Sequence, residues 1–424
     1  MMRSREHQAA AGKAIALVAL LLLMTTVPAL AQSSDWAQWG GPQRNFKSEA
    51  KGLAATWPVT GPRRLWQREL GEGYSAIAVE HGMLFTMYRK GENEVVIALD
   101  AATGNNVWEY SYAAPFSPEY DMSNGPGPHA TPLVTSNFVF SSGATGKLHC
   151  LDKKSGKVLW SHDLINEFHG TLRVNGYSCS PIAYKDKIVM MVGGPASSLV
   201  AFNQKDGSVV WKKHDFRNST SSPIVINVDG QDQLVAFMYS EVVGVDPNNG
   251  NLLWSHPHPV DHGLNTSTPV WGSDNLLFIS SGYDGGSRVI KLNRSGDKTT
   301  VEELWAHRLM RVHFTDAIRV GDVVYGSSGD FGPAPFTAIE VKTGKVLWRN
   351  RSFPRASFLL ADGRFIILDE DGQLLLATAT PEGLTVTSKV AVLTSQSWTV
   401  PSLAGTRLYL RDRKNIMALE LGSQ

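Results

Sequence analysis

Cysteine, net charge and long apolar runs are all scarce in this sequence. Two Cys among 424 residues exclude a disulfide-dense scaffold, and no spacing matches a four-ligand zinc module. A formal net charge of +1 disfavours a general nucleic-acid binder, which needs a basic surface to neutralise phosphates. Apart from one N-terminal run, no segment is long and apolar enough to span a membrane. The chain does have 42% hydrophobic residues, enough for a packed core, so disorder is excluded for most of it.

The N-terminal apolar run has the arrangement of a secretory signal peptide. Residues 14–24 form the run, and Ala29-Leu30-Ala31 then places small residues at the positions that a signal peptidase reads. The run is well short of the ~20 residues that a membrane-spanning helix needs, and no Cys closely follows it to carry a lipid anchor. We therefore expect a signal peptide over residues 1–31, cleaved after Ala31, and a periplasmic or secreted protein, with an uncleaved anchor as the alternative. The basic residues before the run are Arg3, Arg5 and Lys13.

One phrase recurs along the rest of the chain: an apolar residue, then Asp, Asn or Glu, a short polar turn ending in Gly, and a Trp four residues later. The acidic or amide side chain can cap the turn, and the Gly supplies a positive φ. Strand-forming residues flank each copy, so each phrase predicts a hairpin whose Trp is buried against the next unit, with its N–H in need of a partner. The five full copies carry Trp108, Trp160, Trp211, Trp254 and Trp348. A sixth copy, with Trp305, has a longer turn. A seventh, with Trp66, matches only the strand after the turn.

The spacing of these tryptophans predicts the fold. Successive Trp residues are about 42 to 52 positions apart, and each unit has room for four short strands, as at 130–135, 137–142, 147–152 and 157–162. Such units are the signature of a β-propeller. We expect an all-β, eight-bladed propeller of four-stranded antiparallel blades over residues 64–424, preceded by a lead-in at 32–63. The last unit has three strands of its own, so a strand at 64–70 should complete it. Seven blades is the alternative count, if the last two units merge, since Thr387 replaces Trp there.

The phrase resembles the pyrroloquinoline-quinone (PQQ)-like repeat, which builds the eight-bladed propellers of quinoprotein alcohol dehydrogenases and of the BamB outer-membrane assembly lipoprotein. The resemblance covers residues 65–421, and Trp36-Ala37-Gln38-Trp39-Gly40-Gly41-Pro42 resembles the Trp-rich lead-in of compact secreted bacterial members. The resemblance implies the propeller fold. For function it implies two classes, a cofactor-dependent dehydrogenase and an assembly protein, because many relatives bind no cofactor.

The chain departs from both classes of relative. The dehydrogenases commonly place a disulfide between adjacent cysteines over the cofactor, whereas Cys150 and Cys179 are separated in the sequence and are expected to be two buried thiols, too far apart to pair. No Cys-x-x-Cys-His haem motif and no long covering insertions are present, and the lipidated Cys of BamB is also missing. Neither relative's function therefore transfers directly.

Candidate ligand-binding residues lie in long loops between blades, at 112–128, 163–176, 256–265 and 307–315, or directly after such a loop, as His129 and Asp316 do. These loops should gather on one face of a propeller, and long polar loops are where function is usually found. Such a ring of groups could hold an anionic ligand or a divalent cation, and a solvated polar rim is the alternative. The candidates are Asp121, His129, Glu167, His169, Arg173, Arg311, His313 and Asp316.

A weaker candidate for a metal site is the set His256, His258 and His262, because imidazoles suit zinc or copper. Prolines interleave the first two, and nothing in the sequence orients the rings. His162, His256 and His307 each follow a Trp by two residues, which places both side chains on one face of a strand. We therefore expect a structural pairing between blades rather than three metal ligands.

These observations favour a secreted or periplasmic binding or assembly module that meets a protein, a peptide or an extracellular polymer at the long-loop face. No nucleic acid, membrane span, lipid anchor or cofactor is expected, and no catalytic residue is identified. The alternative is a PQQ-dependent alcohol or sugar dehydrogenase at the same face, with Asp121, Glu167 or Asp316 as oxygen ligands of Ca²⁺ and Arg173 or Arg311 supplying charge. A hydrolase or lyase is a third possibility, for which no nucleophile motif is visible.

Overall fold

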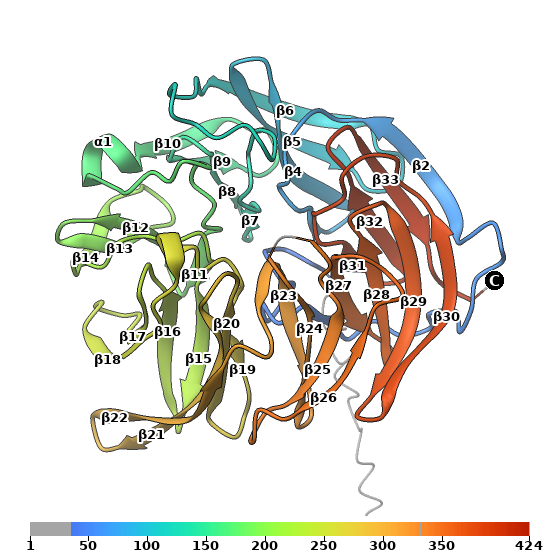
Figure 1. Cartoon of the computed structure of the whole chain (residues 1–424). Coiled ribbons are helices and arrows are strands. Elements are labelled where there is room, and N and C mark those ends of the chain that lie inside the picture. The colour runs from blue at the N-terminus through green and yellow to red at the C-terminus, as the bar shows by residue number, and fades with distance from the viewer. Residues whose placement is uncertain (1–34, 331, 424) are drawn as a thin grey trace, which may run out of the picture. The chain divides into compact units, whose positions relative to one another are not determined.

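The computed structural model describes residues 35–330 and 332–423, which belong to one compact unit. They form eight sheets around a central axis (Figure 1). This is the all-β, eight-bladed β-propeller that the repeat predicted, so the seven-bladed alternative is wrong. The predicted signal peptide, residues 1–31, lies outside the described residues.

The first four blades are formed in chain order, from axis to rim. They contain β3 (Ala78–Glu80), β4 (Met83–Lys90), β5 (Asn93–Asp100) and β6 (Asn106–Ala113); β7 (Leu133–Val134), β8 (Phe138–Ser142), β9 (Lys147–Asp152) and β10 (Val158–Asp163); β11 (Ile182–Tyr184), β12 (Lys187–Gly194), β13 (Ser197–Asn203) and β14 (Val209–Lys213); and β15 (Ile224–Val228), β16 (Gln231–Phe237), β17 (Glu241–Val245) and β18 (Leu252–Pro257).

The last four blades add two strands from the N-terminal part of the chain. They contain β19 (Val270–Trp271), β20 (Leu276–Ser281), β21 (Gly286–Ser295) and β22 (Lys298–His307); β23 (Val312–Val320), β24 (Val323–Ser328), β25 (Phe336–Glu340) and β26 (Val346–Asn350); β27 (Ala356–Ala361), β28 (Arg364–Asp369), β29 (Gln373–Thr380) and β30 (Gly383–Ala391), with β1 (Lys47–Ser48) beside β27; and β31 (Ser402–Ala404), β32 (Arg407–Arg411), β33 (Asn415–Glu420) and β2 (Arg63–Glu69).

The described chain contains two short helices, α1 (Leu164–Phe168) and the 3₁₀ helix η1 (Asp261–Gly263), both in connections between blades. No helix among the described residues has the length and apolar character needed to cross a membrane.

The two middle strands of each blade are buried on both faces because neighbouring blades pack against them. Val95, Val96 and Ile97 of β5 are all buried, whereas exposed residues alternate with buried or partly buried ones along much of the rim strand β6. Apolar runs in the middle and alternation at the rim therefore follow from one arrangement, in which sheets stack face to face around the axis.

The eighth blade is completed as the sequence predicted. Strand β2, from the N-terminal part of the chain, pairs antiparallel with β33 and supplies the rim strand of that blade. Arg411 of β32 then links this blade to the first, because its fully buried guanidinium donates to the carbonyl oxygens of Met87 at 2.6 Å and Gly71 at 3.0 Å. The ring is therefore closed by strand pairing within one blade and by a buried cation between two blades.

The repeated Trp and Gly form one contact between neighbouring blades. The Trp108 ring packs so closely on Gly156 of the next blade that a Cβ there would lie 2.5 Å from it, and Trp108 Nε1 donates to the Lys153 carbonyl at 2.9 Å. The predicted burial of the Trp against the next unit, with a partner for its N–H, is thus confirmed. The same ring-to-glycine packing joins Trp66 to Gly104, Trp160 to Gly207, Trp211 to Gly250, and Trp305 to Gly344.

Trp254 is an exception, and the longer turn that follows it explains why. Its Nε1 donates to Gln233 Oε1 in its own blade at 2.6 Å. The next hairpin, β21–β22, is extended to ten residues in each strand, and nothing lies near the Cβ position of its Gly296. Because this hairpin is longer, its turn glycine, Gly296, does not pack against the Trp254 ring as Gly156 does against the Trp108 ring.

The expected pairing of histidines between blades is confirmed. His162 Nε2 donates to the Gly207 carbonyl at 2.8 Å, and His307 Nε2 donates to the Gly344 carbonyl at 2.8 Å. His256 Nε2 lies 2.8 Å from a carboxylate oxygen of Glu303 on the next blade. These imidazoles therefore fasten the same blade boundaries as the tryptophans.

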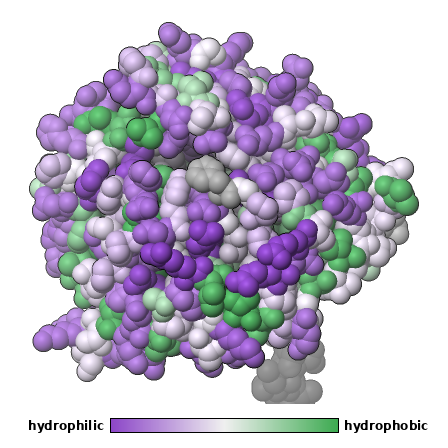
Figure 2. Space-filling model, in the orientation of Figure 1, coloured by the Kyte–Doolittle hydropathy of each residue, from purple (hydrophilic) through white to green (hydrophobic). Residues whose placement is uncertain are grey.

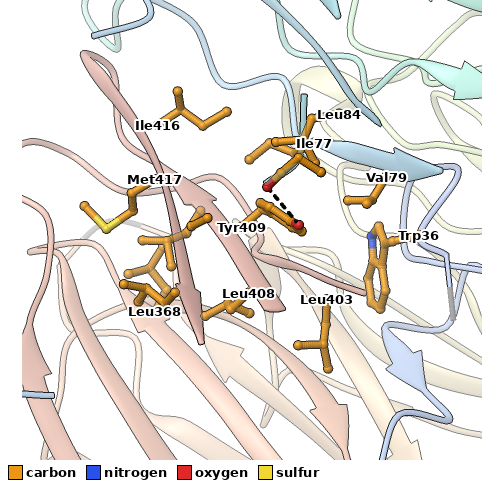
Figure 3. Packing of buried hydrophobic residues seen from close by; sticks show 14 of the residues in the cluster. Trp36, Ile77, Val79, Leu84, Leu368, Leu403, Leu408, Tyr409, Ile416 and Met417 are labelled. Atoms are coloured by element: carbon orange, nitrogen blue, oxygen red, sulfur yellow. Dashed lines mark hydrogen bonds between the residues drawn. The ribbon is translucent and has the colours of Figure 1, made fainter. Parts of the chain in front are cut away.

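The N-terminal lead-in packs along the inner strands. Trp36 forms two main-chain hydrogen bonds with Val79 of β3, at 2.9 and 3.0 Å, and its ring lies beside Val79 and Leu403 in the core (Figure 3). The Ala37 carbonyl accepts a hydrogen bond from Val134 of β7 at 2.8 Å. Strand β1 then pairs parallel with β27, so this segment reaches from the first two blades to the seventh.

Both cysteines are free and buried, as the sequence predicted. Burial raises the pKa of Cys150 to about 12 and that of Cys179 to about 11. Neither thiol is therefore activated as a nucleophile.

Candidate functional site

One residue from each blade lines the axis of the propeller. In six blades this residue stands four positions before the first strand, as His129 does before β7 and Trp398 does before β31. Because the inner strands converge on the axis, side chains at this position meet around its end. We call these residues the axial ring. In blade order they are Tyr74, His129, Ser178, Thr220, Thr266, Phe314, Arg355 and Trp398.

One arc of the axial ring is aromatic. The His129 and Tyr74 rings stack with centroids 5.8 Å apart, and the Tyr74 and Trp398 rings stack at 5.6 Å. Trp398 and Phe314 continue the series at 5.0 Å, and the Arg355 guanidinium carbon lies 4.8 Å from the centre of the Phe314 ring. Blades six, eight, one and two thus supply a continuous aromatic wall, against which Arg355 of blade seven packs.

The other arc of the axial ring carries hydroxyl groups. Ser178, Thr220 and Thr266 come from blades three, four and five, and all three line the same cavity. The hydroxyls of Thr220 and Thr266 lie 2.9 Å apart across a blade boundary. The cavity is therefore bounded by aromatic rings on one side and by short polar side chains on the other.

A second series of contacts lies two residues further along each blade. The main-chain N–H of Thr131 donates to Ser180 Oγ at 3.0 Å, and that of Ser180 donates to Ser222 Oγ at 3.0 Å. The N–H of Thr268 donates to Asp316 Oδ1 at 2.6 Å in the same way. Hydrogen bonds from blade to blade therefore fix the positions of the axial ring.

Asp316 is the ionisable member of this second series. Burial raises its pKa to about 6, although the Thr268 hydrogen bond and the nearby Arg44 charge favour the carboxylate. Arg44 is itself buried, and desolvation lowers its pKa to about 10, so it remains a cation at neutral pH.

The lead-in closes one end of the axis. Trp39 Nε1 donates to Thr268 Oγ1 at 2.9 Å. The Arg44 guanidinium donates to the carbonyls of Pro181 at 2.8 Å and Ser180 at 3.2 Å. Trp39 therefore forms a floor, supported by Arg44, and the axis is a blind cavity rather than a channel.

The cavity above this floor has a volume of about 520 Å³. It is lined by seven members of the axial ring, by Trp39 and Asp316 at its base, and by loop residues such as Asp121 and Asn175 at its mouth. Its charged lining residues are two aspartates, and none of the lining residues is Lys or Arg. At the mouth, Asp121 accepts hydrogen bonds from the Ser123 N–H at 2.8 Å and from Asn175 Nδ2 at 3.2 Å.

Two buried polar side chains of the cavity wall have no hydrogen-bond partner in the protein. The His313 side chain is 1% exposed, and neither of its ring nitrogens is bonded. The Thr315 hydroxyl is likewise buried and unbonded. Burial and the nearby Arg355 charge lower the pKa of His313 to about 4, so its imidazole is neutral at neutral pH. Unpaired buried polar groups are costly, which makes these two side chains natural contacts for a ligand.

The structure brings four of the sequence-predicted ligand residues into this cavity and leaves four outside its lining. Asp121, His129, His313 and Asp316 line it. Glu167, His169, Arg173 and Arg311 lie outside the lining. The sequence had grouped them with the first four because all of these loops were expected on one face.

The four residues outside the lining each have a separate structural contact. Glu167 lies 2.6 Å from His162 Nδ1, and His169 caps the C-terminus of α1 in a left-handed conformation. Arg173 donates to the His262 carbonyl. Arg311 pairs with Asp330 at 3.2 Å.

The weak metal candidates His256, His258 and His262 do not converge. His256 contacts Glu303, and His258 lies 3.0 Å from Ser281 Oγ. The His262 ring packs on Tyr283 with centroids 5.8 Å apart. Over the described ranges, no group of three His, Cys, Asp or Glu side chains is placed to hold a metal ion.

Sequence reasoning missed the aromatic wall and the floor. Tyr74 and Trp398 lie outside the long loops that were singled out, and Phe314 was passed over because only charged and imidazole side chains were considered there. The available signal was positional, because both Tyr74 and Trp398 stand four residues before a first strand. No local pattern indicated that Trp39 would enter the axis.

Comparison with known proteins gives one matching family. The family model described as "Outer membrane protein assembly factor BamB" matches residues 92–350, which is more than half of the chain. BamB of Yersinia pestis is 22% identical over 285 residues, covering 62% of this chain and 63% of that protein. The quinoprotein alcohol dehydrogenase PedH of Pseudomonas putida is 29% identical over 133 residues, covering 30% of this chain and 21% of that enzyme. The chain thus spans less than two thirds of either relative.

Solved structures resemble the fold of the chain. BamB from Moraxella catarrhalis superposes with a TM-score of 0.60 at 16% identity, over 85% of this chain and 99% of that one. Quinohemoprotein alcohol dehydrogenase from Comamonas testosteroni superposes with a TM-score of 0.65 at 13% identity, over 92% of this chain and 81% of that one. Because BamB and an alcohol dehydrogenase match about equally well, these likenesses establish the propeller and do not decide its function.

Proposed function

The chain belongs to the family of outer membrane protein assembly factor BamB, and from this premise we propose that it is a binding module of the cell envelope whose ligand enters the axial cavity. The ligand is part of a protein, a peptide or an extracellular polymer. The family match and the N-terminal signal-peptide pattern, which lies outside the described residues, support a periplasmic or secreted location.

The observation that carries this proposal is the blind cavity of about 520 Å³ on the axis. Its floor is built by Trp39, its wall comes from the inner ends of the blades, and its mouth is surrounded by interblade loops. Concave sites of this size, made of aromatic side chains and a few placed polar groups, are typical of ligand pockets. On the visible face of the propeller, hydrophilic residues predominate and apolar residues form separate patches (Figure 2). That surface favours recognition in the cavity over docking on one broad apolar area.

The residues of this site do not fit a Ca²⁺-bound PQQ. The quinone carries several carboxylates and needs cationic or amide partners, but the lining of the cavity contains no Lys or Arg, and one of its two amides, Asn175, already donates to Asp121. A calcium ion needs six to eight oxygen ligands, whereas Asp121 stands at the mouth and Asp316 at the floor. Among the described residues no cluster of three potential metal ligands occurs. We therefore derive no oxidation step for this chain.

The proposal is tested by filling the cavity. Ser178 belongs to the arc of the axial ring that carries hydroxyl groups, so a Ser178→Trp substitution places an indole inside the cavity. The matched control is Val107→Trp, which adds the same ring at a rim position that is 48% exposed. Both proteins are mixed with envelope fragments of the producing organism and sedimented.

We expect wild type and Val107→Trp to sediment with the fragments and Ser178→Trp to stay in solution. Circular dichroism and thermal unfolding of the three proteins check that the substitutions leave the propeller folded. Equal sedimentation of Ser178→Trp and Val107→Trp, with both folded, would show that the cavity is not the binding site.

A further inference from the structure

We propose that the axial cavity binds a neutral saccharide, entering as the end of a glycan chain. This inference rests on the proposed function, because it names the ligand class of the same site. Charge, surface chemistry, unpaired polar groups and shape each point to this class.

The charge of the cavity argues against anionic ligands. Asp121 and Asp316 are its charged lining residues, and the cavity lining holds no Lys or Arg that could pair with a phosphate, sulfate or carboxylate. Two arginines lie near the cavity, and both are occupied by other partners. Arg44 lies beneath the floor, where it donates to the carbonyls of Pro181 and Ser180. Arg355, the member of the axial ring outside this lining, pairs with Glu370 at 3.3 Å and donates to the Asp330 carbonyl. A ligand without negative charge is therefore favoured.

The two arcs of the axial ring match the two kinds of surface on a sugar. A pyranose has apolar C–H faces, which pack on aromatic rings, and hydroxyls around its edge. Tyr74, Trp398 and Phe314 supply a continuous aromatic wall, with ring centroids 5.6 and 5.0 Å apart. Thr220 and Thr266 face the cavity from the opposite arc and offer hydroxyls to the edge of the sugar.

His313 and Thr315 require partners that both donate and accept hydrogen bonds. A neutral imidazole has one N–H donor and one bare nitrogen acceptor, and both nitrogens of His313 are buried and unbonded. The Thr315 hydroxyl is also buried and unbonded. A sugar hydroxyl donates and accepts at one oxygen, so neighbouring hydroxyls can satisfy an imidazole and a threonine together.

The shape of the cavity favours the end of a chain. A volume of about 520 Å³ holds one or two sugar rings, and the Trp39 floor prevents a polymer from passing through. A polypeptide that entered by its C-terminus would bring a carboxylate, to which the cavity lining offers no cation. The non-reducing end of a neutral glycan carries no charge to be compensated.

The test uses the purified protein and isothermal titration calorimetry. The probes are cellobiose, maltose, xylobiose and N,N′-diacetylchitobiose, each raised to about 10 mM so that a Kd of ~1 mM is detected. Digalacturonic acid is the anionic comparison, and the unblocked peptide Ala-Tyr-Ala is the peptide comparison. We expect saturable binding of at least one neutral disaccharide and none of digalacturonic acid.

Two isosteric variants locate the binding. Thr315→Val removes a buried hydroxyl of the cavity, and Thr300→Val makes the same change at an exposed position of β22. We expect Thr315→Val to raise the Kd of the bound disaccharide about 3- to 10-fold, as the loss of one hydrogen bond implies, and Thr300→Val to leave it unchanged. Equal Kd values for the two variants would place the sugar outside the cavity and overturn the proposal.

The outcomes also separate this proposal from the proposed function. If no neutral disaccharide binds while Ser178→Trp still abolishes sedimentation with envelope fragments, the cavity is a binding site but its ligand is not a neutral saccharide. Saturable binding of Ala-Tyr-Ala in place of the sugars would assign the cavity to peptides. If no disaccharide binds and Ser178→Trp sediments like wild type, both proposals are wrong.

Discussion

The main-chain N–H of Thr268 donates to the Asp316 carboxyl at 2.6 Å across the boundary between the fifth and sixth blades. At the corresponding places between earlier blades, the acceptor is the hydroxyl of Ser180 or Ser222. Asp316 thus puts an ionisable group where its neighbours use a neutral one. Burial raises the pKa of this carboxyl to about 6, a range in which its effect on stability can be measured.

We predict that Asp316→Asn makes the unfolding free energy less dependent on pH. The pKa of Asp316 is about 6 in the folded protein and 3.8 as its ordinary value, so the folded state holds more protons between these limits. The stability that this carboxyl contributes is complete below its ordinary pKa and is lost as the pH rises through about 6. The free energy of unfolding of the variant, relative to wild type, should therefore rise by about 1–3 kcal/mol between about pH 4 and pH 7.

Urea denaturation of both proteins across this pH range measures the difference. Burial also raises the pKa values of Glu94 and Asp369, but both carboxyls are present in both proteins and cancel in the comparison. A constant difference between Asp316→Asn and wild type would contradict a buried, titrating Asp316.

The contact between Trp108 and Gly156 predicts a steric effect that a matched glycine can isolate. A Cβ at Gly156 would lie 2.5 Å from the Trp108 ring, whereas nothing lies within 4 Å of the Cβ position at Gly82. Both glycines have positive φ, 70° and 78°, so Gly156→Ala and Gly82→Ala carry similar backbone strain. Gly156→Ala should lower the unfolding free energy by about 1–3 kcal/mol more than Gly82→Ala, which thermal denaturation can compare. Equal losses of unfolding free energy in the two variants would show that the close packing of Trp108 on Gly156 does not constrain the side chain at position 156.

Arg411 predicts how strongly the last blade is held to the first. Its guanidinium is buried and donates to the carbonyls of Met87 and Gly71, which Met in its place would leave unpaired. Arg411→Met should therefore lower the unfolding free energy by about 2–5 kcal/mol. The control is Arg407→Met on the same strand, where the side chain is exposed and the expected loss is below about 0.5 kcal/mol. Similar urea midpoints for the two variants would refute a role for Arg411 in closing the ring.

The burial of the two cysteines predicts that thiol reagents modify them slowly in the native protein. Burial raises the pKa values of Cys150 and Cys179 to about 12 and 11, so the reactive thiolate is scarce and inaccessible. Ellman's reagent should label both thiols quickly in denaturant and at least about 100-fold more slowly in the native protein. Peptide mapping after air oxidation should find no Cys150–Cys179 disulfide. Rapid labelling of either thiol in the folded protein would contradict its buried position.

The sequence predicted the repeat and the ring because both depend on local patterns. The turn that opens with Asp152 and reaches Gly156 is encoded within a few residues, and the Trp that follows at a fixed distance marks the blade boundary. Even the exception at Trp254 had a visible cause, the longer turn before Trp305. The strand that closes the eighth blade was found by counting the strands that were missing.

The cavity was predicted only in part because its chemistry depends on contacts between distant segments. The search favoured charged residues in long loops, which recovered Asp121 and His313 but also included Glu167, whose partner is His162 at the edge of the same blade. Trp39 reaches Thr268 across 229 positions, and no periodicity in the lead-in indicates that contact. Position before an inner strand, rather than charge, identifies the residues that meet on the axis.

The placement of the lead-in imposes an order on the maturation of the protein. Strand β1 pairs with β27 and strand β2 pairs with β33. Segments made early during synthesis can therefore pair only after nearly the whole chain has been made. Until then the floor at Trp39 is missing and the cavity is open at both ends. A chain stalled in translation or export would therefore expose unpaired strand edges and an unfinished site together, so that only a completed ring can bind.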